Sequence, residues 1–186
     1  NGYWKDVGTL GSYWEANMEL IDIIPEFNLY EEFWKIYTKG DIIRPQYISE
    51  DAVVDRSLIS EGAEIYGEVH NSVIGADVTI EPGAIVRGSI IMRHCRIGAG
   101  CVIDKAIIAE NVTVGKNVVM GEGEEALNVL KPAVYSFGLV TIGEDSKIPS
   151  NVVIGKNTAI TGITTLEDYP DGRLESGGAI IGKDGE

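Results

Sequence analysis

Residues 74–91 read Ile74-Gly-Ala-Asp-Val-Thr-Ile80-Glu-Pro-Gly-Ala-Ile-Val86-Arg-Gly-Ser-Ile-Ile91, with an aliphatic residue at every sixth position. Spacings of six return further along the chain, at Ile97 and Ile103, at Ile108 and Val114, and at Ile142, Ile148, Ile154 and Ile160. A helical period of 3.6 residues cannot produce this spacing over so many units. Each hexapeptide instead predicts a short strand and a turn, and three of them complete a triangular coil around stacked aliphatic side chains.

The repeat therefore predicts a mainly β protein, a parallel β-helix of about five coils. Roughly four coils fit between Ile48 and Met120, and about one more between Ile142 and Ile160. Residues 121–140 break the pattern and are expected to leave the coil as a loop. The tail from Leu166, rich in Gly, Asp and Glu, is expected to cap the last coil or to trail from it.

The turns of the coil carry their own signal. Four asparagines occupy the same phase of their repeats, in two pairs six residues apart: Asn111, Asn117, Asn151 and Asn157. Asparagine and glycine tolerate a positive φ better than other residues do. The asparagines are therefore expected at left-handed corners between strands.

Composition limits the classes of partner. The chain of 186 residues has 29 acidic against 15 basic residues and a formal net charge of −14, which argues against nucleic acid or an anionic membrane as the main ligand. No apolar run is long enough for a membrane-spanning helix, and no secretory leader opens the sequence. Cys95 and Cys101 lie one repeat apart, which favours two thiols in a reducing cytoplasm over a zinc site.

The first forty residues follow a different pattern. Thr9 and Ser12 both offer helix N-caps, and Ser12 with Glu15 makes a capping-box pattern. Apolar residues at helical spacing follow, and Pro25 is expected to end the helix. We therefore divide the chain into residues 1–40, a helical segment, and residues 41–186, the β-helix with its loop at 121–140.

Several motifs in this sequence resemble one enzyme family. They are Gly2-Tyr-Trp-Lys-Asp-Val-Gly-Thr9, Tyr13-Trp-Glu-Ala-Asn-Met18, Pro25-Glu-Phe-Asn-Leu-Tyr30, Pro45-Gln-Tyr-Ile48, Ser57-Leu-Ile-Ser-Glu-Gly62 and Cys101-Val-Ile-Asp-Lys-Ala106. The family is bacterial glucose-1-phosphate adenylyltransferase, also called ADP-glucose pyrophosphorylase. The resemblance implies a left-handed coil, and it implies that residues 1–40 close a nucleotidyltransferase domain of which the rest lies upstream.

The resemblance also implies a reaction. The family joins ATP and glucose 1-phosphate into ADP-glucose and pyrophosphate for glycogen synthesis, with Mg²⁺ neutralising the triphosphate. By motif match Asp6 is one of two aspartates that hold the metal, and Tyr3 and Trp4 lie in the neighbourhood of the substrate pocket. One carboxylate cannot hold Mg²⁺ firmly, so the 186 residues alone are expected to be inactive, with no catalytic residue of their own.

The resemblance further implies assembly and regulation. In the family the β-helix supports a homotetramer and shapes an allosteric site for a phosphorylated metabolite, and Lys105 matches a basic position that contacts this anion. Arg87, Arg93 and Arg96 are candidates to add charge, although nothing in the sequence shows that they converge. The chain ends in Gly-Lys-Asp-Gly-Glu186 and lacks the basic tail of enteric relatives, which argues against their type of activation.

Two other functions remain open from the sequence. A hexapeptide-repeat acyltransferase would use a histidine as general base, and His70 and His94 are the candidates. That reading leaves the motifs of residues 2–30 unexplained. A non-catalytic regulatory subunit of the same family is the other alternative, and the presence of Asp6 argues mildly for a catalytic subunit.

Overall fold

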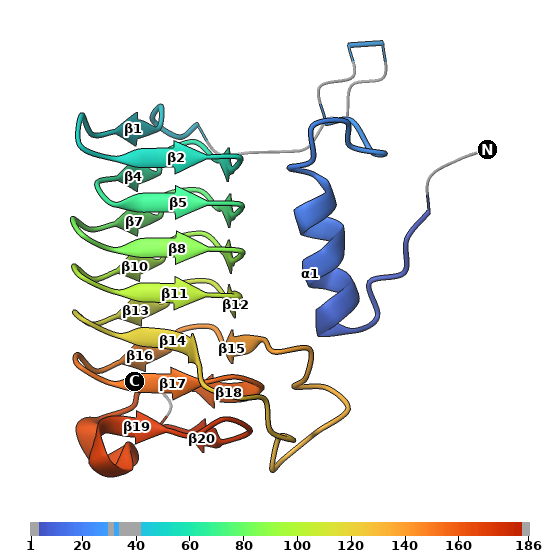
Figure 1. The fold of residues 1–186 in the computed structure, drawn as a ribbon. Coiled ribbons are helices and arrows are strands. Elements are labelled where there is room, and N and C mark those ends of the chain that lie inside the picture. The colour runs from blue at the N-terminus through green and yellow to red at the C-terminus, as the bar shows by residue number, and fades with distance from the viewer. Residues whose placement is uncertain (1–3, 30–31, 34–41, 184–186) are drawn as a thin grey trace.

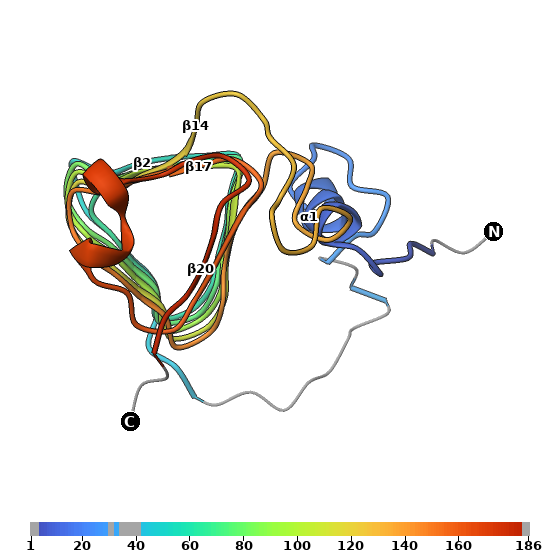
Figure 2. The ribbon, with the colours of Figure 1, turned by 90° about the horizontal axis from the view of Figure 1, so that it is seen from below.

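A parallel β-helix dominates the computed structural model, which describes residues 4–29, 32–33 and 42–183 (Figure 1). Its strands form three parallel sheets, one on each side of a triangular coil (Figure 2). This architecture confirms the mainly β, hexapeptide-repeat fold predicted from the spacing of six. The described residues contain no helix with the length and apolar character that crossing a bilayer requires.

The three sheets take every third strand in turn. Sheet A contains β1 (Tyr47–Ile48), β4 (Glu64–Ile65), β7 (Thr79–Ile80), β10 (Arg96–Ile97), β13 (Thr113–Val114) and β16 (Lys147–Ile148). Sheet B contains β2 (Val53–Asp55), β5 (Glu68–His70), β8 (Ile85–Arg87), β11 (Val102–Asp104), β14 (Val119–Glu122), β17 (Val153–Gly155) and β19 (Arg173–Leu174). Sheet C contains β3 (Leu58–Ile59), β6 (Val73–Ile74), β9 (Ile90–Ile91), β12 (Ala106–Ile108), β15 (Val140–Ile142), β18 (Thr158–Thr161) and β20 (Ala179–Ile181).

The strand order gives six complete coils and a seventh that lacks only its strand in sheet A. The expectation of about five coils was therefore too low. Residues 47–161 already form six complete coils, and the tail adds the incomplete seventh, in which β19 and β20 pair with β17 and β18 although the tail lacks a clear repeat. Two 3₁₀ turns, Leu166–Asp168 and Pro170–Gly172, stand where the seventh strand of sheet A would be.

Stacked aliphatic side chains fill the coil. In sheet A, Ile65, Ile80, Ile97, Val114 and Ile148 are successive register partners, and each is at most 3% exposed. Cys95 and Cys101 belong to the same core and are free thiols. Burial raises the pKa of the Cys95 thiol to about 11, so it behaves as a small apolar side chain.

Left-handed corners join the strands, as the asparagines predicted. Asn111, Asn117, Asn151 and Asn157 have φ values of 60°, 53°, 63° and 55°. Asn117 donates to the Oδ1 of Asn151 on the next coil at 3.0 Å. The corner residues therefore bond from coil to coil in addition to satisfying the turn.

Helix α1 (Leu10–Glu19) lies beside the stack of coils (Figure 1). Thr9 is the N-cap: its Oγ1 accepts from the backbone N–H of Ser12 at 3.1 Å, and the Ser12 Oγ accepts from the N–H of Thr9 at 3.1 Å. The capping box predicted for Ser12 and Glu15 therefore lies one turn earlier, at Thr9 and Ser12. Ser12 takes the N3 position of the box, which Glu or Gln usually fills. The helix also ends at Glu19, well before Pro25.

Residues 123–139 leave the coil between β14 and β15. Asn128 holds this loop to the β-helix: it is 3% exposed, and its Nδ2 donates to the carbonyl oxygens of Asn157 at 2.8 Å and Gly178 at 3.2 Å. Asn157 in turn donates to the carbonyl of Ala126 at 2.9 Å and accepts from the N–H of Gly138 at 2.7 Å. Figure 2 shows the loop meeting α1 outside the corner between sheets B and C.

Candidate functional site

Lys105 lies at the junction of α1, the loop and the β-helix. It occupies the corner between β11 and β12 with φ of 50°, a conformation that lysine seldom adopts. Its Nζ lies 4.3 Å from the ring centroid of Phe137 and 5.3 Å from that of Trp14. The ammonium group is therefore held by two aromatic rings and is not an ordinary solvated surface charge.

Trp14 anchors α1 to the coil. Its Nε1 donates to the carbonyl oxygen of Gly88 at 2.6 Å, at the corner one coil before that of Lys105. Its ring lies 5.9 Å from the ring of Phe137, tilted by 59°. Below it, Ile90 and Ile107 from sheet C are each only 3% exposed and pack with Leu10, Tyr13 and Met18 of the helix. One indole thus joins the helix, the corner and the loop.

The loop completes the junction from the other side. Phe137 contacts Trp14, and Leu139 belongs to the small apolar cluster under α1. Gly138 between them has φ of 74° and is buried, with the Glu125 carboxylate and the Lys105 Nζ both near its Cα. An acidic side chain and an ammonium group therefore lie close to the space that a Cβ on this glycine would take, and the positive φ favours glycine here.

The predicted metal ligand Asp6 lies in the turn before α1. Its Oδ1 accepts from the backbone N–H of Gly8 at 2.9 Å, so the carboxylate closes this turn. Among the described residues, no group of three or more His, Cys, Asp or Glu side chains gathers to hold a metal ion. The described residues therefore place Asp6 in a turn and bring no cluster of metal ligands around it.

Tyr3 and Trp4 are the two residues predicted to lie near the substrate pocket. Trp4 is 83% exposed and Tyr3 lies outside the described residues. Between Trp4 and Asp6, the Lys5 ammonium bonds the Glu19 carboxylate at the end of α1 and lies 3.8 Å from Glu15. This ion pair ties the segment of residues 4–8 to the helix.

The three arginines do not form one pocket with Lys105. Arg93 pairs with Glu110 at 2.9 Å at another corner of the coil, and Arg96 bonds Glu81 on sheet A. Arg87 alone shares the corner of Lys105, where its carbonyl accepts from the Lys105 N–H at 3.0 Å. Of the four basic residues, only Arg87 and Lys105 lie on neighbouring coils of the same edge.

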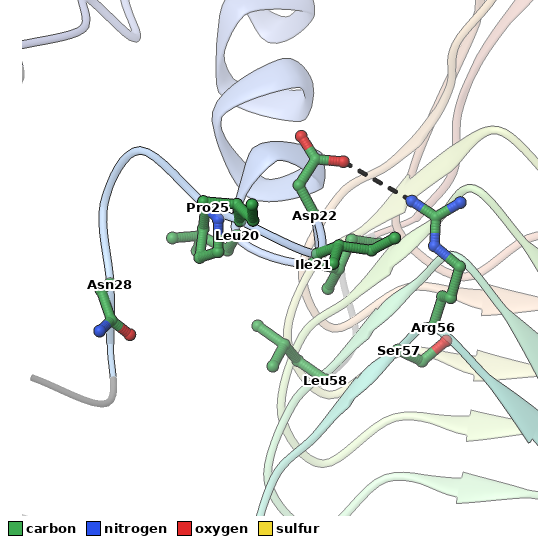
Figure 3. A pocket seen from close by; sticks show the side chains of 10 residues that line it. Leu20, Ile21, Asp22, Pro25, Asn28, Arg56, Ser57 and Leu58 are labelled. Carbon is green, nitrogen blue, oxygen red and sulfur yellow. Dashed lines mark ion pairs between the residues drawn. The ribbon is translucent and has the colours of Figure 1, made fainter.

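A pocket of about 490 Å³ lies at the far end of α1, against the first coil (Figure 3). Leu20, Ile21, Pro25 and Leu58 line it, and an ion pair of 3.6 Å between Asp22 and Arg56 closes one side. Arg56 sits at the same left-handed edge as Lys105, three coils earlier, with φ of 42°. Arg56 and Lys105, at the same edge of the coil, therefore both contact the N-terminal segment.

Neither His70 nor His94, the candidate general bases of an acyltransferase, lies in the pocket against the first coil. His94 is a corner residue with φ of 59°, and its Nδ1 lies 3.8 Å from Asp77. His70 lies in β5, where its Nε2 is 3.1 Å from the Glu68 carboxylate. The side chains lie on different edges of the coil, and neither lines the pocket of Figure 3.

Sequence reasoning missed Trp14 and Phe137 of the junction at Lys105, and Arg56 of the pocket against the first coil. Trp14 was noted only as part of a motif, and Phe137 lies in a segment without any repeat. The available signal was the unusual corner residue: Arg56 and Lys105 occupy positions where the repeat elsewhere favours Asn or Gly. A basic residue at such a position indicates a contact made outside the coil.

Comparisons with known proteins agree with the motifs. A family model for the GlmU-like C-terminal hexapeptide matches residues 45–128. The chain is 65% identical over 97% of its length to a glucose-1-phosphate adenylyltransferase of Lachnospira eligens, and 45% identical over 100% of its length to one of Acetivibrio thermocellus. It is 47% identical over 97% of its length to one of Thermotoga maritima.

The matches extend through the non-repeat segment of residues 1–40 as well as the coils, because they cover nearly the whole chain. The chain spans 43% of the length of each of these three relatives. It therefore corresponds to the C-terminal, hexapeptide-repeat part of glucose-1-phosphate adenylyltransferases, and this confirms the relationship expected from the motifs.

Proposed function

We propose that this chain is the assembly and regulatory half of a cytoplasmic enzyme that makes ADP-glucose and pyrophosphate from ATP and glucose 1-phosphate for glycogen synthesis. The observation that carries the proposal is the 65% identity to a relative of that name over 97% of the chain, N-terminal segment included. A shared β-helix alone would not distinguish this function, since one fold serves many reactions. The two buried free thiols fit a reducing compartment.

The junction at Lys105 is the proposed regulatory site. The ammonium group lies between the β-helix and the segment that leads toward the catalytic domain, and two rings hold it in place. A phosphorylated metabolite that binds Lys105 would compete with these rings for the charge. Binding would then change how firmly α1 and the loop are held, which is a physical route from effector to catalytic domain.

Asp6 is proposed as one of two ligands for Mg²⁺, which would supply charge neutralisation at the triphosphate. The role of this chain is to fix the carboxylate: the Gly8 N–H donates to one oxygen, and the Lys5–Glu19 pair holds the segment before α1 against the helix. We expect Asp6→Asn to lower turnover of the complete enzyme about 100-fold or more, while its oligomeric state stays unchanged. Unchanged turnover at saturating Mg²⁺ would remove Asp6 from the site.

The test of the function uses the complete gene product and the 186-residue chain side by side. Pyrophosphate release from ATP is measured with and without glucose 1-phosphate, and the nucleotide sugar is identified by mass. The complete protein is expected to form ADP-glucose and the chain alone to form none. A complete protein that forms no nucleotide sugar but releases thiol from acetyl-CoA would overturn the proposal in favour of an acyltransferase.

A non-catalytic subunit is the remaining alternative. It would form no ADP-glucose by itself but would change the turnover or effector response of an active partner. Homotetramer formation by the complete protein, with activity in that state, supports the catalytic reading. Loss of the effector response in Lys105→Gln, with basal turnover kept, is the expected sign of the regulatory site.

A further inference from the structure

Two side chains of opposite charge lie beside Gly138. A Cβ added to this glycine would lie 2.8 Å from the Glu125 Oε1 and 3.5 Å from the Lys105 Nζ, so the two charged groups are no farther apart than the sum of these distances. Within the part of the chain that the structure describes, neither charged group forms an ion pair or a hydrogen bond. A carboxylate and an ammonium group are therefore close together without being bonded to each other.

A buried asparagine fixes the backbone that carries Glu125. Asn157 is 6% exposed; its Nδ2 donates to the carbonyl of Ala126 at 2.9 Å, and its Oδ1 accepts from the N–H of Gly138 at 2.7 Å. One amide thus clamps together the two ends of the loop that meets α1 outside the corner between sheets B and C (Figure 2). Glu125 is therefore held beside Gly138, although its side chain is exposed.

The surroundings of the Lys105 ammonium group are of two kinds. The rings of Phe137 and Trp14, with centroids at 4.3 Å and 5.3 Å, attract a cation but carry no net charge. The Glu125 carboxylate carries a full negative charge on oxygen atoms, as a phosphate group does. An ammonium group binds either anion through charge-assisted hydrogen bonds. The rings therefore leave the charge of Lys105 available, and Glu125 is in place to offset it.

We propose that Glu125 is a built-in competitor of the regulatory anion at Lys105. A phosphate group bonded to the Lys105 Nζ lies close to the Glu125 carboxylate, and two negative charges at such a distance repel each other. The phosphate group therefore binds as the exposed carboxylate turns away into solvent. Glu125 thus raises the effector concentration at which the site fills. This inference rests on the regulatory role proposed for Lys105.

Position distinguishes Glu125 from the other acidic residues of the chain. Glu124 is an exposed carboxylate one residue earlier in the same loop. The three atoms nearest to the Cβ position at Gly138, apart from the chain neighbours of the glycine, belong to Glu125 and Lys105 and not to Glu124. Solvent and salt screen charges that lie farther from the site. Glu124 is therefore a matched control, because its neutralisation changes the net charge equally.

The test measures the binding of inorganic phosphate to the complete protein by equilibrium dialysis at low ionic strength. Lys105→Gln defines the site, because only the binding that this variant loses is assigned to Lys105. At that site Glu125→Gln is expected to lower the dissociation constant about fivefold or more, since the repulsion is removed. Glu124→Gln should stay within about twofold of the wild-type protein.

A further variant separates the charge of Glu125 from its shape. Glu125→Asp keeps a carboxylate and removes one methylene group. Its dissociation constant for phosphate is expected to stay within about twofold of the wild-type value, because a negative charge still opposes the anion. Urea titrations of all the variants check that the fold is kept.

Two kinds of result would overturn the inference, and they separate it from the proposed function. Phosphate binding that Lys105→Gln leaves intact would remove the regulatory role of Lys105 and the competitor role of Glu125 together. Binding that needs Lys105 but is no tighter in Glu125→Gln would remove the competitor role alone. An equal gain in Glu124→Gln would also contradict it, because net charge and not position would then explain the effect.

Discussion

The β-helix and helix α1 are stabilised in opposite ways. The six complete coils bond to one another along three sheets, and core side chains such as Ile65 and Ile97 are fully buried. Helix α1 has no fully buried residue and is anchored at few points, chiefly the Trp14 hydrogen bond and the rings around Lys105. The β-helix is therefore stabilised by its own coils, whereas α1 depends on contacts with the corner at Lys105 and with the loop of residues 123–139.

The largest effect is expected in the coil. Ile97→Ala removes a fully buried side chain between Ile80 and Val114 and leaves a cavity, because neighbouring coils hold the backbone in place. We expect the free energy of unfolding to fall by about 2–5 kcal/mol in urea titrations. The control Thr113→Ala on the outer face should stay within about 0.5 kcal/mol of wild type.

Trp14→Ala should loosen helix α1 and leave the β-helix unchanged. It removes the bond to the Gly88 carbonyl and the contact with Phe137, which together we estimate at about 2 kcal/mol. Limited proteolysis is expected to cut residues 10–29 and 123–139 faster, while the coil remains resistant. Trp14→Phe keeps a ring without the donor and should lie in between. Equal cleavage in all three proteins would show that Trp14 is no anchor.

Alkaline pH should weaken the coil before it affects α1. Burial holds the pKa of the Cys95 thiol at about 11, above its usual value of 9.0, so folding favours the neutral thiol. The stabilisation is complete below pH 9 and is lost as the pH rises through 11, by about 1 kcal/mol at pH 10. Between pH 8 and 11, the melting temperature of Cys95→Ala should fall less with rising pH than that of the wild-type chain.

The smallest effect is expected at Lys105. Lys105→Met removes the charge that lies over the rings of Trp14 and Phe137, whereas Lys105→Arg keeps a cation there. The lost cation–π interaction is expected to lower the stability of the docked helix by about 0.5–1 kcal/mol. Fluorescence of the tryptophans and proteolysis of α1 should distinguish the two variants. If Lys105→Met behaves as Lys105→Arg does, the rings do not recognise the charge.

The two regions also differ in how far the sequence could predict them. The spacing of six predicted the coil, its aliphatic columns and the corners at Asn111 and Asn117, because each repeat contacts only its neighbours. It did not predict β19 and β20, since a terminal coil pairs through its backbone with little need for the repeat. It could not predict the junction either, because Trp14, Lys105 and Phe137 meet only through the docking of non-repeat segments.

Native-state hydrogen exchange of the 186-residue chain tests most directly the claim that a self-sufficient coil carries a dependent helix. We predict that the amides of the central coils, from β7 to β14, exchange only through global unfolding. Those of Leu10–Glu19 should exchange earlier, through a smaller opening that also releases residues 123–139. Exchange of α1 and the central coils at one common rate would contradict the account, because it would show a single cooperative unit.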